Sequence, residues 1–202
     1  RVIKVTSPLS VGSFILAPFS ALSSAAAASF VTGRLPRLGR LAGAGAALFG
    51  PALATYTAAL LSNTAVPAWH EAHRELPFVF AGSGASAAGG LAMLLTPAAQ
   101  NLPARRIAIA GAAVELTAAE LLKRRLGMVA EPYQQGRPGL LMRTASRMTA
   151  GAAVLSALGG RSRVVSALCG ATYVSASVLT RFGVFEAGLA SARDPKYTVV
   201  PQ

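Results

Sequence analysis

The stretch LPFVFAGSGASAAGGLAMLL, residues 76–95, contains no charged side chain. A helix of about 20 apolar residues is long enough to cross the hydrocarbon core of a bilayer. Pro77 stands at the start of the stretch and Pro97 just beyond its end, where prolines commonly flank a helix. Gly82, Ser86 and Gly90 repeat at four-residue spacing, which places small residues on one helix face. We therefore expect a membrane helix that packs closely against its neighbours.

The same apolar pattern recurs along the chain and predicts an all-α fold, a polytopic transmembrane helix bundle of about six spans. The bundle is expected over residues 1–185, followed by a polar C-terminal tail at 186–202. The expected spans are residues 10–31, 41–63, 76–95, 106–122, 142–158 and 164–185. Pro51 is expected to kink the second span, and Arg143 and Arg147 weaken the fifth. Ser20, Ser24 and Ala28 form a second stripe of small residues in the first span.

The composition excludes an ordinary soluble domain. Hydrophobic residues make up 53% of the chain and charged residues only 13%, whereas a soluble domain carries about 25% charged residues. The net charge of +12 comes from Lys and Arg between the apolar runs, where they set topology and meet lipid head groups rather than nucleic acid. Three short connections that share one side of the bundle carry arginines and no acids, which favours that side as cytoplasmic. These arginines are Arg34, Arg37, Arg40, Arg105, Arg106, Arg161 and Arg163.

Cysteine and histidine usage limits the cofactors that this chain could hold. Cys169 is the single cysteine and lies in an apolar run, so neither an iron–sulfur cluster nor a zinc site can be built on it. His70 and His73 are the only histidines and share one loop, whereas a bis-histidine haem needs ligands from two spans. We expect no metal, because Glu71 alone adds too little to this pair. Either histidine could deliver protons to a bound quinone, and Trp69 beside them fits an interfacial anchor.

Ionisable residues within membrane spans are costly, so each is a candidate for function. Glu115 lies near the middle of the fourth span, either as a proton-path carboxylate or as the partner of Arg147 or Arg181. Glu120 could extend a proton path, but its spacing to Arg124 favours a surface salt bridge. Arg181 could snorkel towards the membrane surface or hold a quinone oxygen. Tyr56 in the second span is either a hydrogen-bonded core residue or a ligand contact.

Three stretches together resemble the NrfD family, the quinone-binding membrane anchor subunits related to that of polysulfide reductase. They are TSPLSVGS at residues 6–13, GPALATYTAALL at residues 50–61, and the tail DPKYTVVPQ at residues 194–202. The tail is similar to actinobacterial members in particular. The resemblance extends over essentially the whole chain, through the order and spacing of the stretches.

The resemblance implies a bundle of about eight spans, so two spans are expected to precede Arg1. It further implies a bound menaquinone or other quinone without haem, and a location in the plasma membrane of a bacterium. A four-cluster ferredoxin-like iron–sulfur subunit is the implied partner, often with a molybdopterin catalytic subunit. Tyr56 matches the tyrosine that contacts the quinone in that family.

The leading hypothesis is a quinone-reactive anchor subunit of a respiratory oxidoreductase complex, which is not catalytic on its own. Its candidate quinone-binding residues are Tyr56, His70, His73 and Arg181, and its candidate proton-path residues are Glu115 and Glu120. The alternative is a secondary transporter or ion pathway, suggested by Glu115 and the proline in the second span. A purely structural anchor is the third possibility.

Overall fold

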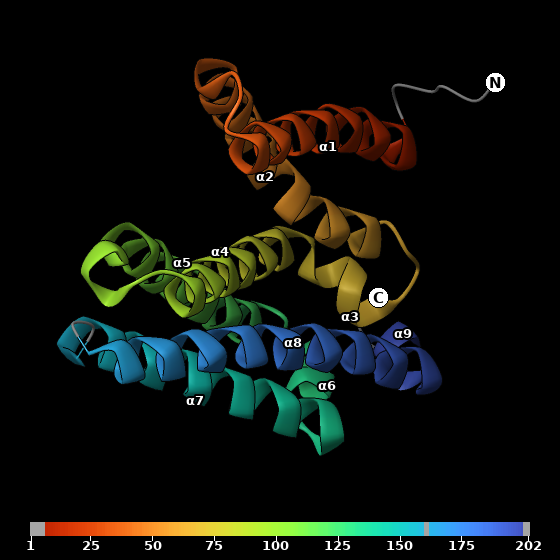
Figure 1. The fold of residues 1–202 in the computed structure, drawn as a ribbon. Coiled ribbons are helices and arrows are strands. Elements are labelled where there is room, and N and C mark those ends of the chain that lie inside the picture. The colour runs from red at the N-terminus through yellow and green to blue at the C-terminus, as the bar shows by residue number, and fades with distance from the viewer. Residues whose placement is uncertain (1–6, 160–161, 200–202) are drawn as a thin grey trace. The chain divides into compact units, whose positions relative to one another are not determined.

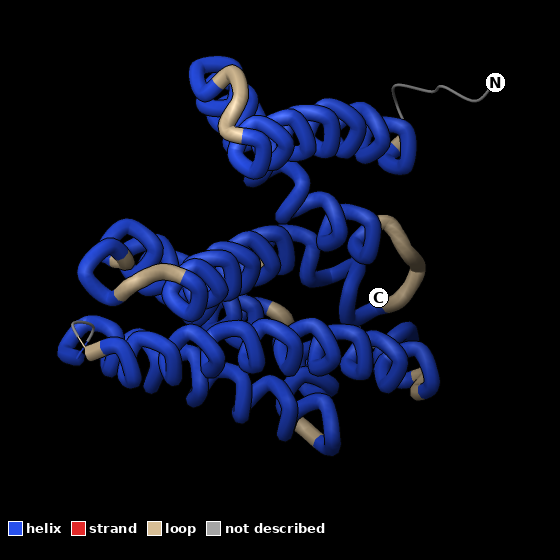
Figure 2. The backbone as a smooth tube through the Cα atoms, in the orientation of Figure 1, coloured by secondary structure: helices blue, strands red, loops and turns tan. Residues whose placement is uncertain are grey.

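The computed structural model describes residues 7–159 and 162–199, and within these ranges every regular element is a helix (Figure 1). Figure 2 shows how short the connecting loops are. The long helices are α1 (Pro8–Thr32), α2 (Pro36–Ser62), α4 (Leu76–Leu95), α5 (Leu102–Arg125), α7 (Gly136–Gly159) and α8 (Arg163–Arg193). The short ones are α3 (Pro67–Glu71), η1 (Ala72–Arg74), η2 (Ala98–Gln100), η3 (Gly127–Ala130), α6 (Glu131–Gln134) and α9 (Lys196–Val199). The prediction of an all-α fold is confirmed.

Four of these helices, rather than the expected six, are long and apolar enough to cross a membrane. They are α1 over Ser10–Thr32, α2, α4 and α8. Helices α5 and α7 form where the fourth and fifth spans were expected, but ionisable residues interrupt their apolar sequences. The chain is therefore a helical membrane protein with four candidate spans among the described residues.

The ends of several helices differ from the sequence-based boundaries. Helix α2 begins at Pro36, so the expected nine-residue connection shrinks to Gly33–Leu35, where Gly33 and Leu35 have φ of 67° and 52°. Helix α2 runs on through Pro51. Helix α8 continues to Arg193, although the polar tail was expected from residue 186, and α9 follows. A helix can extend beyond the apolar run because charged side chains reach past its end into the head-group region.

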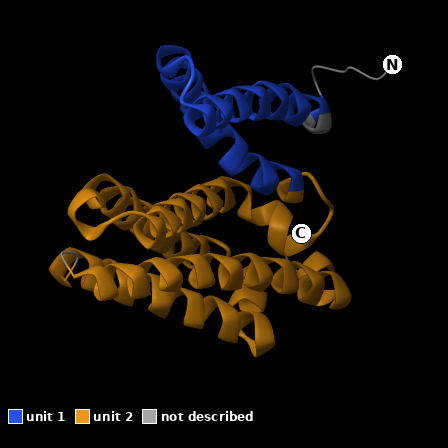
Figure 3. Ribbon diagram, viewed as in Figure 1, with its two compact units in different colours: residues 1–60 blue, residues 61–202 orange. Residues whose placement is uncertain are grey.

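The chain divides into two compact units, residues 1–60 and residues 61–202 (Figure 3). In the first unit α1 and α2 form an antiparallel hairpin. A Cβ on Gly45 would lie 3.0 Å from a Leu22 methyl group, and one on Gly39 would lie 2.3 Å from Ser29 Oγ. Residues later in α1 thus contact residues earlier in α2, as in any antiparallel pair of helices. These glycines let the two backbones approach each other.

The second unit is a four-helix bundle in which α4 packs on α5 and α8, while α7 packs on α8 and α5. The expected small-residue stripe of α4 is buried as predicted: Gly82 faces α5 and Gly90 faces α8. The end of α4 is closed by Arg163, whose guanidinium donates to the carbonyls of Met93 (3.0 Å), Leu94 (2.6 Å) and Thr96 (2.6 Å). Arg163 thereby satisfies carbonyls that have no partner within their own helix.

Candidate functional site

Close packing of α4 against α5 brings Glu115 into the interior of the second unit. A Cβ on Gly82 would lie 2.5 Å from the Glu115 backbone nitrogen, and one on Gly111 would lie 2.6 Å from the Ser86 nitrogen. Only glycine allows two helix backbones to come this close. The Glu115 residue is consequently 4% exposed, between α4 and α8.

The Glu115 carboxylate has one firm hydrogen bond and one open oxygen. Thr180 Oγ1 donates to Oε1 at 2.7 Å, whereas Oε2 is buried and has no hydrogen-bond partner among the described residues. Ser83 and Ser86 of α4 lie beside the carboxylate. A buried oxygen without a partner costs free energy comparable to a lost hydrogen bond. The open oxygen therefore marks Glu115 as a group able to take up a proton or a ligand.

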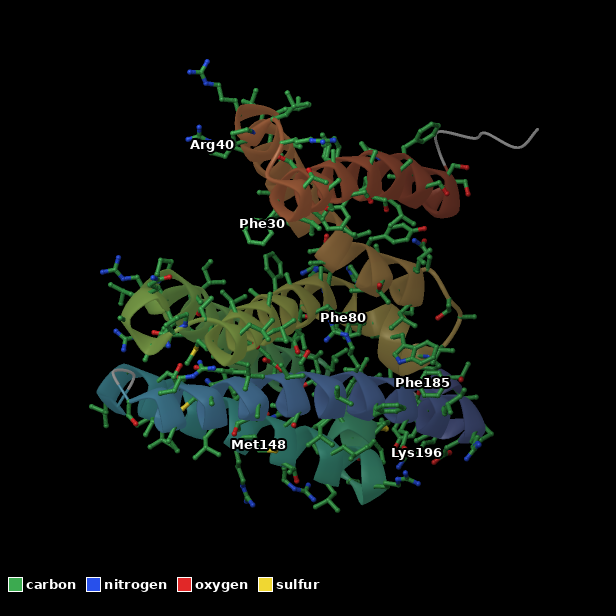
Figure 4. The ribbon with its side chains drawn as sticks, in the orientation of Figure 1. Phe30, Arg40, Phe80, Met148, Phe185 and Lys196 are labelled. Carbon is green, nitrogen blue, oxygen red and sulfur yellow. The ribbon has the colours of Figure 1, made fainter. Side chains whose placement is uncertain are left out.

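Arg181 joins the same cluster from one residue beyond Thr180. Its Nη1 donates to Ser177 Oγ at 2.9 Å and lies 3.4 Å from Ser83 Oγ, while Ser83 Oγ donates to Ser177 Oγ at 2.9 Å. The guanidinium carbon lies 5.4 Å from the centre of the ring of Phe80. Phe80 is labelled in Figure 4. Arg181 forms no ion pair of ordinary length within the described residues, although it acts electrostatically on Glu115. The structure thus brings together two of the predicted site residues, and Arg181 rather than Arg147 is the arginine near Glu115.

Glu120 is placed differently, although it lies only five residues further along α5. Its side chain is 52% exposed and pairs with Arg124 at 3.0 Å and Lys123 at 3.8 Å. This is the surface salt bridge that its spacing to Arg124 favoured. Glu120 does not share the buried cluster of Glu115.

His70 and His73 are exposed neighbours on α3 and η1, with ring centroids 6.4 Å apart. The Nδ1 atom of His70 lies 3.0 Å from the Ser62 carbonyl, and that of His73 lies 3.0 Å from the His70 carbonyl. A carbonyl can only accept, so Nδ1 carries the proton, and Nε2 of the neutral ring is an acceptor. No group of three potential metal ligands occurs in the described part of the chain.

Trp69 is not an interfacial anchor, since its residue is only 7% exposed. Its Nε1 donates to the Val184 carbonyl at 2.8 Å, and its ring occupies the space that a side chain on Gly188 would need. Tyr133 and Ser191 hold the same segment, by hydrogen bonds to the carbonyl and the amide of Ala68. Helix α3, which carries His70 and leads directly into η1 with His73, is therefore fastened to α8 within a turn of Arg181.

Tyr56 belongs to the first unit, where its half-buried ring lies on the backbone of Gly12. A Cβ on Gly12 would lie 1.9 Å from the Tyr56 Cζ atom. Gly12 and Tyr56 belong to two of the stretches that carry the family resemblance, and they meet in the α1–α2 hairpin. Gly12 is needed there because any side chain would displace the tyrosine.

Sequence reasoning missed the hydroxyl groups of this interior. Ser83, Ser177 and Thr180 complete the Glu115–Arg181 cluster, and buried Thr149, Ser156 and Tyr173 carry oxygens without a hydrogen-bond partner in the described ranges. The spacing of Ser177 and Arg181, four residues apart, was the available signal. Serine and threonine are so common in membrane helices that spacing alone does not separate a site from helix packing.

Comparison with known proteins adds no relative: the chain matched no family model, no curated protein and no solved structure.

Proposed function

We propose that this chain is the quinone-binding membrane subunit of a respiratory oxidoreductase complex. The cluster of Glu115 and Arg181 is the observation that supports this proposal best. It combines a buried carboxylate, an accessible guanidinium and an aromatic ring at one place in a helical membrane protein. Charged groups in such helices mark functional sites by default.

The residues present fit a quinone head group. Only Nη1 of Arg181 is committed to Ser177 and Ser83, so the outer edge of its guanidinium has N–H donors for a carbonyl oxygen. The Phe80 ring beneath the guanidinium fixes its position. The open Oε2 of Glu115 is the group that holds and releases a proton. When bound, the quinone supplies the two-electron chemistry.

His70 and His73 fit the proton exchange with the aqueous side, because both are exposed on the segment fastened to α8. A neutral imidazole has one nitrogen that donates and one that accepts a proton, so either side chain can pass protons on. Tyr56 is the quinone contact that the family resemblance proposes, from the α1–α2 hairpin. We place Glu120 outside the proton path, because its carboxylate is held by Lys123 and Arg124 at the surface.

The electron partner is proposed to be a four-cluster ferredoxin-like iron–sulfur subunit, with a molybdopterin catalytic subunit beyond it. Menaquinone is the proposed quinone, and a bacterial plasma membrane the proposed location. These statements rest on the NrfD-like stretches, two of which pack on each other through Gly12 and Tyr56. Gentle purification of the tagged chain tests them. Co-purification of a subunit rich in Cys-x-x-Cys motifs supports the proposal, and its reproducible absence opposes it.

A proton or ion pathway is the second candidate function, because the open Glu115 oxygen does not by itself require a quinone. Reconstituted vesicles separate the two functions. Proton flux through the isolated chain, abolished by Glu115→Gln, would favour the pathway. Quinol-linked electron transfer that depends on Arg181 would favour the anchor.

The direct test removes the Arg181 charge in the complex and measures quinol-linked electron transfer. We expect Arg181→Gln to lower the rate at least about tenfold, the effect of one lost hydrogen bond from a charged group. Arg193→Gln is the matched control, since Arg193 lies exposed at the end of the same helix. Equal rates in both variants would refute the role of Arg181. Unchanged turnover in Tyr56→Phe would refute the role of Tyr56.

A further inference from the structure

A groove of about 580 Å³ runs between α4 and α5 on the second unit. It is distinct from the Glu115 cluster, which lies on the inner side of the same two helices. Apolar side chains form most of its wall, and two charged residues stand at one end. The lining residues are Arg74, Glu75, Phe78, Ala113, Val114, Thr117, Ala118 and Leu121.

Polarity changes in one direction along this groove. Arg74 precedes the candidate span Leu76–Leu95 by two residues, whereas Phe78 lies inside the span. Because α5 runs antiparallel to α4, Val114 lies deeper than Leu121. The charged end is thus at the level of lipid head groups and the apolar part at the level of the acyl chains. The groove matches an amphiphile that enters with its tail first.

At the charged end of the groove, which we call its mouth, Arg74 is a cation without an ion-pair partner. Glu75, its neighbour, is clasped by Arg125, whose Nε lies 2.5 Å from Oε1 and whose Nη2 lies 2.7 Å from Oε2. Arg125 Nη2 also donates to the Glu71 carbonyl, which ties the end of α3 to the end of α5. Neither Glu71 nor Glu75 forms a salt bridge with Arg74 in the described ranges. The mouth therefore presents an exposed, unneutralised guanidinium.

We propose that this groove binds an anionic phospholipid, with the phosphate at Arg74 and an acyl chain along Phe78, Val114 and Leu121. The unneutralised guanidinium selects a head group with net negative charge over a zwitterionic one. A neutral quinone would use the apolar wall and could accept only a hydrogen bond from Arg74, whereas a phosphate also gains the attraction between opposite charges. Charge therefore favours the anionic lipid over the quinone.

Native mass spectrometry of the full chain in mild detergent tests the proposal. The probes are phosphatidylglycerol and phosphatidylcholine with identical acyl chains. We expect the wild-type chain to retain phosphatidylglycerol preferentially, and Arg74→Gln to reduce that retention about fivefold, as one basic residue near a head group contributes. Arg106→Gln removes the same charge at the other end of α5 and should leave retention unchanged.

A second variant tests the apolar part without changing charge. Ala113 is exposed in the groove wall, so Ala113→Phe should fill the groove, leave the fold intact and weaken retention of both lipids. Wild-type retention in Arg74→Gln, or equal retention of the two lipids by the wild-type chain, would overturn the proposal. Displacement of the lipid by a quinone analogue, with equal affinity in wild type and Arg74→Gln, would also overturn it and assign the groove to the quinone.

Discussion

The two units of this chain are both built from apolar helices, but they bury those helices to different extents. None of the most apolar window of α1 is buried and 11% of that of α2, against 44% for α4 and 39% for α8. Both units contain stripes of small residues. In α4 the stripe is buried by neighbours on two sides, whereas Ser20, Ser24 and Ala28 of α1 are exposed. Small-residue spacing therefore permits close packing but does not specify it.

The buried cluster of Glu115 and Arg181 occurs only in the more closely packed of the two units. Glu115 and Arg181 lie in the unit whose helices are packed on several sides, where hydroxyl groups from α4 and α8 converge on them. A two-helix hairpin cannot surround a carboxylate in this way. Several surrounding helices are needed to lower the free-energy cost of placing a charge within the membrane.

The largest effect is expected from a side chain inserted between α4 and α5. Gly111→Leu should destabilise the bundle by about 3 kcal/mol or more, because the backbone of Ser86 cannot move out of the way. Thermal unfolding in detergent measures this loss. Gly43→Leu in the first unit is the matched control, since a Cβ there would meet only Ala26 at 4.0 Å. Similar destabilisation by both variants would show that the units are packed alike.

The next effect separates the two carboxylates of α5. Glu115→Gln removes the proton-exchanging group, so quinol-linked turnover should fall about 100-fold, within the range of general acid–base contributions. Glu120→Gln loses only a surface salt bridge and should leave turnover nearly unchanged. If the two variants had equal turnover, Glu115 would have no special role in the buried cluster.

A smaller effect concerns the clasp between Glu75 and Arg125. The hydrogen bond from Arg125 lowers the pKa of Glu75 below its usual value of 4.5. The clasp is therefore fully formed above pH 4.5, and its contribution is lost as the pH falls through the lowered pKa of the folded state. Glu75→Gln should cost about 1–3 kcal/mol at neutral pH.

The control for this prediction is the pH dependence itself. Unfolding followed at decreasing pH should show the difference between wild type and Glu75→Gln shrinking in acid. A difference that stayed constant below pH 4 would contradict the assignment of the effect to the carboxylate charge.

The smallest effect should come from a stabilising change in the first unit. Gly43 lies within α2, and the nearest atom to its added Cβ is 4.0 Å away. Gly43→Ala should raise stability by about 0.5–1 kcal/mol, because alanine loses less conformational freedom in a helix. Destabilisation instead would indicate that another surface packs on this position in the membrane. Thermal unfolding measures the change. Gly151→Ala in α7 is the variant to compare, because a Cβ on Gly151 would meet no atom within 4 Å.

The positions of the long helices follow from the apolar runs, but their ends do not. Residues 76–95 match α4 as predicted. Helix α2 begins before Leu41 because Arg37 and Arg40 are good helix formers outside the apolar core, and α8 continues past Phe185 for the same kind of reason. The apolar runs at residues 106–122 and 142–158 predicted that α5 and α7 would also be spans. The charged residues of these two helices exclude them from the four candidate spans.

The candidate site was only partly predictable. Glu115 and Arg181 stand out because charges are rare in apolar sequence, but the pairing of Glu115 with Thr180 depends on how α5 and α8 are rotated against each other. That rotation is set by contacts such as Gly82 on Glu115 and Gly90 on Gly170, which join residues far apart in the chain. Tyr56 could be singled out by resemblance, whereas its contact with Gly12 follows only from the hairpin.

Trp69 gives this protein a built-in optical reporter. It is the single tryptophan of the chain, and its indole is stacked 6.0 Å from Phe185 while its Nε1 donates to the Val184 carbonyl. Intrinsic tryptophan emission therefore arises from one junction, that between α3 and α8. Separation of α3 from α8 would expose the indole and shift its emission to the red without any label. A ligand near Arg181, one turn away on α8, would therefore be detected in the unmodified chain if its binding separated the two helices.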